Sequence, residues 1–394
     1  WARVIGVDRF VTGTGIRDDL AAIDSRYQKK QGTKIDKFEY IRAMTTYAAG
    51  HLKQDLVKLW ADESAEAINW YGDRLAERGV ELWHESGDSV DPAYHHHFPT
   101  GHSPRWRTSD DGTGKPLNGN KILFDYATKK GARFDYNTRM VKLEKKDGRV
   151  TGVKAEIDGK IHQVNAKKGV VIATGGFSAN VALRAKLNPF YGEGFKTTNL
   201  PCAQGDGIFM AEKVGAASVN MEQIQTYPMC DPISGAIELI DDARFEGAIL
   251  INQEGKRFVE ELERRDVMSK AILEQTGQYC YALFNQAVED RAHAIEHHQD
   301  EVRVFSKTGI LKTGKTLDEV AAAFDIPADA LKATVARVNE FAKTGKDLDF
   351  GYRGKFSDLS EGPYWIYRGV PSVHHTMGGG EVDVPSVICV ISGY

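Results

Sequence analysis

The sequence has few of the features that mark several large classes of protein. Only four of its 394 residues are cysteines, and they lie far apart without a C-x-x-C pair, which disfavours a zinc site or a disulfide framework. No run of about 18 apolar residues occurs, so no transmembrane helix is predicted. The net charge of -4 lacks the basic excess typical of nucleic-acid-binding proteins. Residues 1–9 show neither the basic nor the apolar part of a signal peptide, and the compartment stays open.

What the sequence does contain is typical of a soluble globular protein. Hydrophobic residues make up 41% and charged residues 27%, and the length allows two or three domains. Glycine is abundant, with 39 residues, several of them in short clusters. Clustered glycines indicate backbone that closely approaches a ligand. The G-x-G-x-x-G fingerprint of dinucleotide-binding units is absent, because Gly13-Thr14-Gly15 follows no buried strand and lacks a third glycine.

Hydrophobic periodicity divides the chain into segments of different type. Residues 36–79 are predicted to be helical, and residues 87–120 to be loop-like. Three antiparallel strands are expected between residues 132 and 165, with Asp147-Gly148 and Asp158-Gly159 at their turns. The run GVVIATGG then predicts a buried strand at Gly169–Ala173 whose end meets a nucleotide or ring system, with a tight turn after a core strand as an equal alternative. Further on, a strand is predicted at residues 247–252, a helix after Arg265 and another helix at residues 328–343.

Two histidine clusters are conspicuous. His95, His96 and His97 are consecutive, with His102 nearby, and consecutive residues cannot all face one metal ion on a regular element. A solvated loop is therefore favoured over a metal site, and no metal site is predicted. In VHHTMGGG, from Val373, two histidines precede three glycines, which suggests a strand followed by a chain reversal. A buried structural histidine and a ligand contact are equally compatible with this second spacing.

Five motifs in a fixed order resemble those of a known family. They are ATGGF from Ala173, GDG from Gly205, GAILINQEGKRFVEE from Gly247, the pair Arg265-Asp266, and HHTMGG from His374. The order and content are similar to the flavoprotein subunits of fumarate reductases and their relatives, which include urocanate reductases and ketosteroid dehydrogenases. The resemblance covers about residues 36–379. It implies an α/β Rossmann-like FAD-binding domain at residues 1–220 and 377–394, with an inserted α+β capping domain at residues 221–376.

The resemblance also implies roles for individual residues. Arg265 matches the arginine that protonates the substrate carbon, Arg244 a second arginine of the proton relay, and His374 the histidine that holds the substrate carboxylate. The positions implied to contact FAD are Ala173, Thr174, Gly175, Gly176, Gly205, Asp206, His375, Met377 and Gly378. In this chemistry the reduced flavin N5 gives a hydride to a C=C bond conjugated to a carboxylate. Positive charge is needed where the carboxylate gains electron density.

The chain departs from the family pattern at both ends. Since the glycine fingerprint is absent, the given residues are expected to begin after the first βαβ unit. The ending GEVDVPSVICVISGY stops short of the family's closing stretch, which carries another glycine-rich flavin contact and a second carboxylate-binding arginine. The implied electron donor, an FMN or haem domain or a separate protein, has no counterpart in the given residues. A flavin-free, non-catalytic fragment therefore stays an alternative.

A third departure bears on the substrate. Tyr227 stands where dicarboxylate reductases of the family have a histidine, and Ile240, Asp241 and Asp242 stand in place of a threonine–glutamate pair. Without the histidine and the threonine, the site lacks donors for the far carboxylate of fumarate, and the added aspartates repel that carboxylate. Tyrosine plus aspartate is similar to the urocanate reductases, where such a pair holds an imidazole. The expected reaction is urocanate to imidazole propionate, with Tyr227, Asp241, Asp242 and His374 binding the substrate.

Other reactions stay open beside this one. Fumarate or an aryl acrylate would use the same hydride and proton transfer. A ketosteroid-type dehydrogenase would run in the opposite direction and would need a tyrosine base and an apolar pocket.

Overall fold

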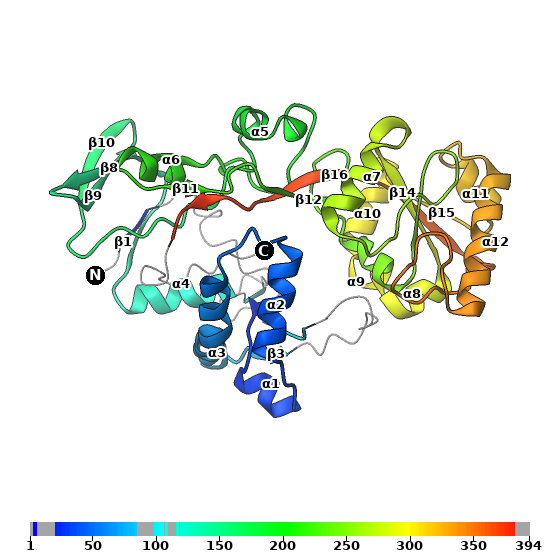
Figure 1. Ribbon diagram of the computed structural model, residues 1–394, viewed down its shortest axis with the longest axis horizontal. Coiled ribbons are helices and arrows are strands. Elements are labelled where there is room, and N and C mark those ends of the chain that lie inside the picture. Colours follow the sequence, from blue (N-terminus) through cyan, green and yellow to red (C-terminus); the bar gives the residue numbers. More distant parts are fainter. Residues whose placement is uncertain are drawn as a thin grey trace.

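The computed structural model describes residues 3–5, 20–84, 98–105, 107–108, 116–117 and 119–382. Its longest dimension runs from a three-stranded sheet at one end to a helix-covered sheet at the other, with the N-terminal helices below the middle (Figure 1). The His95–His97 triplet and Gly13–Gly15 lie outside the described residues.

The predicted helical segment at residues 36–79 is confirmed as two helices. Helix α2 covers Lys37–Tyr47 and α3 covers Gln54–Ala76. Asp36 caps α2 by accepting from the backbone N–H groups of Phe38 and Glu39, which satisfies donors that have no partner inside a helix. Buried side chains of α3 pack with those of β2 (Leu20–Ala21), β3 (Glu81–His84) and α4 (Gly119–Lys129) in one small core.

The expectation for His102 is wrong. His102 lies on β4 (Gly101–Arg105), which pairs with both β2 and β3, and its side chain is fully buried. Its Nε2 is 2.7 Å from the hydroxyl of Ser25, the residue that caps α1 (Arg26–Gln31), and its Nδ1 is 2.8 Å from the Thr100 carbonyl. A strand with partners on both sides buries this ring where composition alone indicated a solvated loop.

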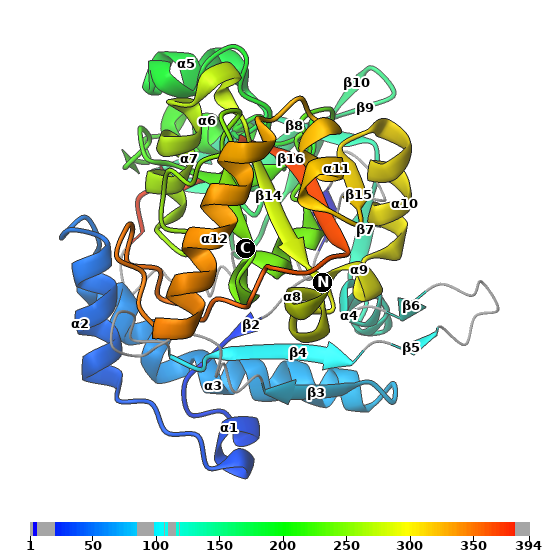
Figure 2. The ribbon, with the colours of Figure 1, turned by 90° about the vertical axis from the view of Figure 1, so that its right-hand side faces the viewer.

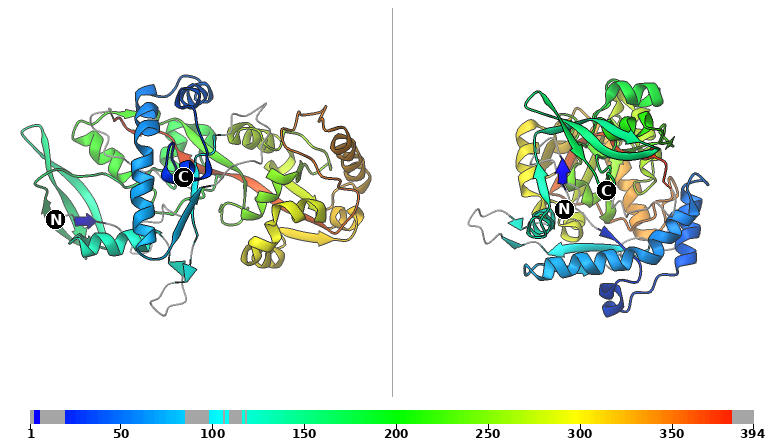
Figure 3. Two further views of the ribbon diagram at one scale, coloured as in Figure 1. Left: turned by 90° about the horizontal axis from the view of Figure 1, so that it is seen from below. Right: turned by 90° about the vertical axis from the view of Figure 1, so that its left-hand side faces the viewer.

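The three predicted antiparallel strands are confirmed. They are β8 (Thr138–Lys146), β9 (Arg149–Ile157) and β10 (Lys160–Asn165), in the order β10-β9-β8. Asp147 and Asp158 at the two turns have positive φ, and each is followed by a glycine of positive φ, as tight hairpin turns require. Helix α6 (Asp206–Lys213) packs on β8, and Figure 3 places this sheet at the end of the molecule away from the cap. The short β7 (Arg133–Asp135) pairs in parallel with β1 (Arg3–Ile5).

The buried strand predicted at Gly169–Ala173 is not formed. Within the described part of the chain this segment pairs with no strand, and the side chain of Val171 is 65% exposed. A parallel strand is stable only with neighbours that bond to its backbone and cover its faces. The apolar composition therefore marks a surface that the described residues leave uncovered.

The largest core lies between Tyr227 and Tyr367, and we call residues 227–367 the cap region. Its sheet has the order β12-β16-β14-β13, with β15 also paired to β16. The strands are β12 (Ile224–Cys230), β13 (Ile249–Ile251), β14 (Cys280–Asn285), β15 (Leu311–Gly314) and β16 (Tyr364–Thr376). Every residue of β13 and β14 is buried, as expected for strands covered on both faces.

Helices cover this sheet, and Figure 2 shows α12 in front of β14 and β16. The predicted helices after Arg265 and at residues 328–343 are confirmed as α7 and α12. The helices of the cap region are α7 (Arg265–Leu273), α8 (Gln286–Ala292), α9 (Ala294–His297), α10 (Gln299–Thr308), α11 (Leu317–Ala322), α12 (Ala328–Thr344) and the 3-10 helices η2 (Leu239–Glu246) and η3 (Thr276–Gln278).

Strands β12 and β16 connect the cap region to the rest of the molecule (Figure 1). They are antiparallel, with Tyr227 opposite Ser372 and Gln225 opposite His375. At their outer ends, Ile224 and Val373 pack with Phe177 and Ile208 in a separate small core. The remaining elements are β5 (Arg107–Thr108), β6 (Pro116–Leu117), α5 (Val181–Leu187), η1 (Pro189–Tyr191), β11 (Ser218–Val219) and β17 (Gly379–Gly380). A search of the described helices finds none with the length and apolarity needed to cross a membrane.

Candidate active site

Three of the predicted site residues meet where β12, β16 and α7 come together. The guanidinium carbon of Arg265, the first residue of α7, lies 4.8 Å from the centroid of the Tyr227 ring. The same ring contacts His374 edge-on, with centroids 5.7 Å apart. Arg265 Nη1 also donates to Gln225 Oε1 at 3.2 Å. A cation, a phenol and an imidazole therefore adjoin one another, from segments up to 147 residues apart in the sequence.

The imidazole of His374 is held from the side by a loop at residues 195–199. The hydroxyl of Thr198 lies 2.8 Å from Nδ1, and the Asn199 side-chain amide donates to the His374 carbonyl. Burial, together with the positive charge of Arg265, lowers the pKa of His374 to about 4. The ring is therefore neutral near pH 7 and can act on a carboxylate only as a hydrogen-bond donor.

Arg244 and Asp241 form a buried ion pair next to this cluster. Their side chains are 5% and 1% exposed, and Arg244 Nε and Nη2 both donate to the Asp241 carboxylate, at 2.9–3.1 Å. The hydroxyl of Tyr367 also donates to Asp241, at 3.0 Å. Buried ions are tolerated when they are paired and hydrogen-bonded in this way. Because Asp241 already accepts four hydrogen bonds, it serves as the partner of Arg244 in the described conformation.

Asp242 does not lie with these residues. Its side chain is 58% exposed and accepts from His298 Nε2, 3.1 Å away. On a 3-10 helix, consecutive residues point about 120° apart, so η2 directs Asp241 inward and Asp242 outward. Glu301 of α10 holds the start of η2 by accepting from the backbone N–H groups of Leu239 and Ile240.

Arg244 and Arg265 line the same cavity, and no direct hydrogen bond joins them in the described part of the chain. The cavity has a volume of about 230 Å³ and is lined by Arg265 and Arg244 together with Tyr47, Phe245, Leu262, Glu263, Arg264 and Met268. Tyr47 comes from α2, so a residue outside the cap region contributes to this wall. The cavity is large enough to hold water beside both arginine residues.

Four of the nine positions expected to contact FAD are exposed, and the other five are partly or fully buried. Ala173, Thr174 and Gly175 are exposed, and Gly175 has φ +72° with no atom within 4 Å of the place a Cβ would take. Val171 beside them is 65% exposed, and Met377 is 58% exposed. Large apolar surface of this kind is usually covered by a ligand or partner. The free space at Gly175 and the exposed apolar side chains beside it leave room for a ligand along this backbone.

Other glycines of the motifs are required by contacts within the protein. A Cβ on Gly176 would lie 1.9 Å from the Thr376 hydroxyl, and one on Gly378 would lie 2.3 Å from the Asn220 carbonyl oxygen. On Gly207 a Cβ would lie 2.2 Å from Thr174 Oγ1. The glycines thus let α6 and the end of β16 approach the segment at residues 172–177.

Gly205 and Asp206 begin α6, where Gly205 has φ +83° and provides no side-chain cap. Asp206 pairs with Arg139 of β8 at 3.0 Å. His375 is also among the expected flavin contacts, and its side chain is half-buried. Burial, together with the positive charge of Arg265, lowers the pKa of His375. A search of the described residues finds no group of three side chains arranged to hold a metal ion.

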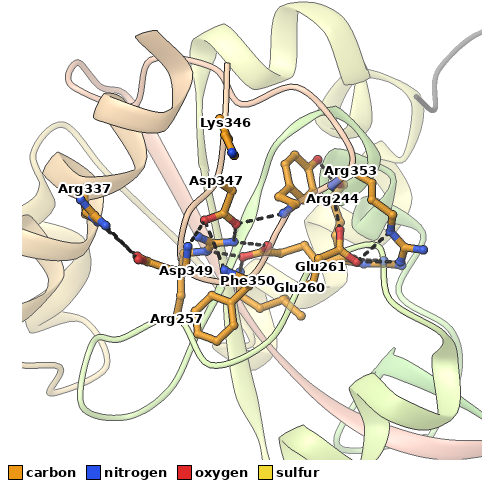
Figure 4. A network of polar contacts seen from close by, with 12 residues as sticks. Arg244, Arg257, Glu260, Glu261, Arg337, Lys346, Asp347, Asp349, Phe350 and Arg353 are labelled. Atoms are coloured by element: carbon orange, nitrogen blue, oxygen red, sulfur yellow. Dashed lines mark hydrogen bonds and ion pairs between the residues drawn. The ribbon is translucent and has the colours of Figure 1, made fainter. Parts of the chain in front are cut away.

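An ion-pair network stabilises the cap region behind the site (Figure 4). Arg257 donates to both carboxylate oxygens of Glu261, at 2.8 and 2.7 Å, and to Asp347 at 2.9 Å. The guanidinium Nη1 of Arg244 donates to the Glu261 carbonyl, and Arg353 pairs with the adjacent Glu260 at 2.7 Å. The network therefore links the buried Arg244 to the loop at residues 346–353.

Sequence reasoning missed two polar residues close to the site. Thr198 contacts His374 across 176 positions, and no local pattern marks it. Glu238 is fully buried, and neither of its carboxylate oxygens has a hydrogen-bond partner among the described residues. A glutamate between two hydrophobic residues, in AIELI, was the available signal for Glu238.

Comparison with known families identifies the fold. The pattern of the family described as FAD binding domain matches residues 21–387. The chain belongs to this family, in the fumarate reductase group of flavoproteins. FAD is therefore the cofactor that this fold binds, in agreement with the exposed glycine and apolar surface.

Individual relatives support the same group. Urocanate reductase of Eggerthella lenta is 41% identical over 244 residues, which cover 61% of this chain and 40% of that protein. A fumarate reductase (cytochrome) of Shewanella frigidimarina is 34% identical over 337 residues, covering 84% of this chain and 54% of that protein. The chain thus spans about half the length of the curated relatives it matches.

Solved structures share the fold. The open conformation of a flavocytochrome c3 fumarate reductase superposes with a TM-score of 0.70 at 24% identity, covering 96% of this chain and 68% of that one. A 3-ketosteroid delta1-dehydrogenase from Sterolibacterium denitrificans gives a TM-score of 0.72 at 17% identity, covering 97% and 89%. The predicted FAD-binding fold with a capping unit is confirmed, whereas the predicted domain boundaries stay a prediction.

Proposed function

We propose that this chain is the catalytic flavin unit of a reductase that saturates a C=C bond conjugated to a carboxylate. The observation that carries the proposal is the contact of Arg265 with the Tyr227 ring, which in turn contacts His374. Such a cluster offers one cation and one neutral donor to an anion beside the flavin surface. The relatives named above, which reduce urocanate or fumarate, support the same class of reaction.

In this proposal the charged and polar residues bind the substrate and supply a proton. Bound FAD supplies the hydride that adds to the β-carbon of the double bond. Arg265 gives the proton to the α-carbon, and its positive charge stabilises the electron density that develops on the carboxylate. His374, neutral near pH 7, donates a hydrogen bond to that carboxylate.

The proton taken from Arg265 must be replaced after each turnover. Arginine is a weak acid, with a pKa above about 12, so it needs a nearby group that returns a proton quickly. The buried pair of Arg244 and Asp241 lies beside Tyr227, and the cavity of about 230 Å³ gives water access to Arg244 and Arg265. We assign proton return to this pair and to water in that cavity.

We favour urocanate as the substrate, with fumarate and acrylate as the alternatives. Tyr227 presents an aromatic face and a hydroxyl where a dicarboxylate substrate needs a further cation or donor. The pairing of Asp242 with His298 leaves Tyr227 as the main residue that distinguishes an imidazole from a second carboxylate. We propose that an imidazole packs against this aromatic side chain more favourably than a second carboxylate, which finds no further cation there. We further propose that an FMN group, a haem group or a partner protein supplies the electrons that reduce the flavin.

The experiment is an anaerobic reoxidation assay. The FAD-loaded protein is reduced chemically, and flavin absorbance is followed after adding urocanate, fumarate or acrylate in parallel. We expect rapid reoxidation with urocanate and slower reoxidation with the other two acids. Faster reoxidation by fumarate would retain the reaction class and overturn the substrate preference, and no reoxidation by any of the three would contradict the proposed reaction.

A further inference from the structure

The hydroxyl of Thr198 is placed to control the hydrogen positions on His374. It lies 2.8 Å from Nδ1, whereas Nε2 has no hydrogen-bond partner among the described residues. A neutral imidazole carries one hydrogen, on either Nδ1 or Nε2, and the bond made by one nitrogen decides the state of the other. Only a ring with hydrogen on Nε2 can donate from its free nitrogen to a carboxylate.

The surroundings of Thr198 favour that form of the ring. Its hydroxyl oxygen already receives the side-chain amide of Asn199, at 3.5 Å. Among the described residues, Nδ1 of His374 is the acceptor available to the hydroxyl hydrogen. If Nδ1 carried a hydrogen instead, Nδ1 and the Asn199 amide would both donate to the Thr198 oxygen. The hydroxyl hydrogen would then lack an acceptor, which is costly for a half-buried group.

The loop that carries Thr198 is fixed by several independent contacts. Val373 N donates to the Lys196 carbonyl and Thr198 N to the Val373 carbonyl, at 2.9 and 3.0 Å. The buried Arg184 donates to the Phe195 carbonyl at 3.0 Å. These contacts fix the backbone at Thr198 and on its N-terminal side, which keeps the Thr198 hydroxyl next to the ring.

We propose that Thr198 is a positioning residue that holds His374 in the tautomer with hydrogen on Nε2, directed at the substrate carboxylate. The inference rests on the proposed function for its catalytic consequence, but the tautomer itself is a property of the protein without substrate. Near pH 7 the ring is neutral because burial and Arg265 lower its pKa to about 4. Thr198 therefore acts on a neutral ring throughout the physiological range.

The test combines nitrogen NMR with kinetics on the FAD-loaded protein labelled with ¹⁵N-histidine. We expect the two ring nitrogens of His374 to have well-separated shifts, with hydrogen on Nε2. Thr198→Val, which keeps the shape and removes the hydroxyl, should make the two shifts converge as both tautomers become populated. Thr198→Ser should restore the separation. His375, whose ring Thr198 does not contact, provides the control signal in the same spectra.

In the reoxidation assay Thr198→Val should raise the KM for the preferred acid about tenfold, the effect of one lost hydrogen bond, with kcat changed much less. Thr198→Ser should recover most of this loss. A wild-type spectrum with hydrogen on Nδ1, or a Thr198→Val spectrum like that of the wild type, would overturn the inference. If the spectra behave as expected but no acid is reduced, the tautomer inference stands and the proposed function fails.

Discussion

Glu238 offers the most direct test of how burial acts in this protein. Its side chain is fully buried beside Gly369, where an added Cβ would lie 2.7 Å from Glu238 Oε2. Neither oxygen has a hydrogen-bond partner among the described residues. Burial raises the pKa of Glu238 well above its usual value, and the negative charge of Asp241 raises it further. We therefore expect Glu238 to keep its proton in the folded protein at pH values where it ionises in the unfolded chain.

The sign of the pH dependence follows from these two states. Below the unfolded pKa of about 4.3, both states are protonated and the full stability is present. As the pH rises, the unfolded chain releases a proton that the folded protein retains, so the free energy of unfolding falls. The expected slope is about 1.4 kcal/mol per pH unit for one proton, and it ends when the pH reaches the folded pKa.

The perturbation is Glu238→Gln, which keeps the size and cannot ionise. Urea unfolding of the FAD-loaded protein is measured at rising pH from about pH 5, and the wild-type value is subtracted from that of the variant. This difference should increase by about 1.4 kcal/mol per pH unit until the pH reaches the folded pKa of Glu238. Any constant effect of the amide cancels, because only the slope is interpreted.

Asp300→Asn is the matched control, since that side chain is 95% exposed and its replacement also removes one carboxylate. It reports the general effect of a changed net charge. Parallel curves for the wild type and Glu238→Gln would refute the reasoning, because Glu238 would then ionise equally in both states.

Three further outcomes are expected. Arg265→Ala should abolish substrate-dependent flavin reoxidation while FAD affinity, measured by fluorescence titration, stays within about twofold; retained turnover would remove Arg265 from the proton step. Tyr227→Leu should raise the KM for urocanate about tenfold, whereas Asp242→Ala, at the exposed His298 pair, should change it less than about twofold; the reverse order would assign imidazole recognition to Asp242. Arg257→Met should lower the free energy of unfolding by about 3–5 kcal/mol, because it leaves Glu261 and Asp347 buried without their partner. Arg337→Met removes a half-exposed pair and should lower the same free energy, measured by the same urea titration, by less than about 1 kcal/mol.

Local patterns predicted the elements whose stability is local. The three strands β8 to β10 are joined by tight turns at Asp147-Gly148 and Asp158-Gly159, so alternation and turn residues were sufficient. Helix α12 likewise follows its hydrophobic period, with Leu331, Val335 and Val338 buried on one face. In each case the signal that predicts the element, a turn or a hydrophobic period, lies within a short stretch of sequence.

The prediction failed where the environment comes from distant residues. Gly169–Ala173 has the composition of a buried strand, yet a strand exists only when its neighbours are present, and the described residues supply none. His102 shows the opposite error. Its burial depends on β2 and β3, whose residues Leu20 and His84 pair with His102 from 82 and 18 positions away. The composition around His102 carries no information on that pairing.

The pair Asp241-Asp242 shows how far a motif can locate a site. The sequence places two carboxylates beside a relay arginine, and a strand-like or loop-like backbone would leave both available to a substrate. The 3-10 turn of η2 separates them, with Asp241 bonded to Arg244 and Tyr367 and Asp242 bonded to His298. A buried carboxylate with a paired arginine can return protons, whereas an exposed one is solvated and screened. Residue type alone indicates two neighbouring charges, but only the backbone geometry decides which of them is buried against Arg244.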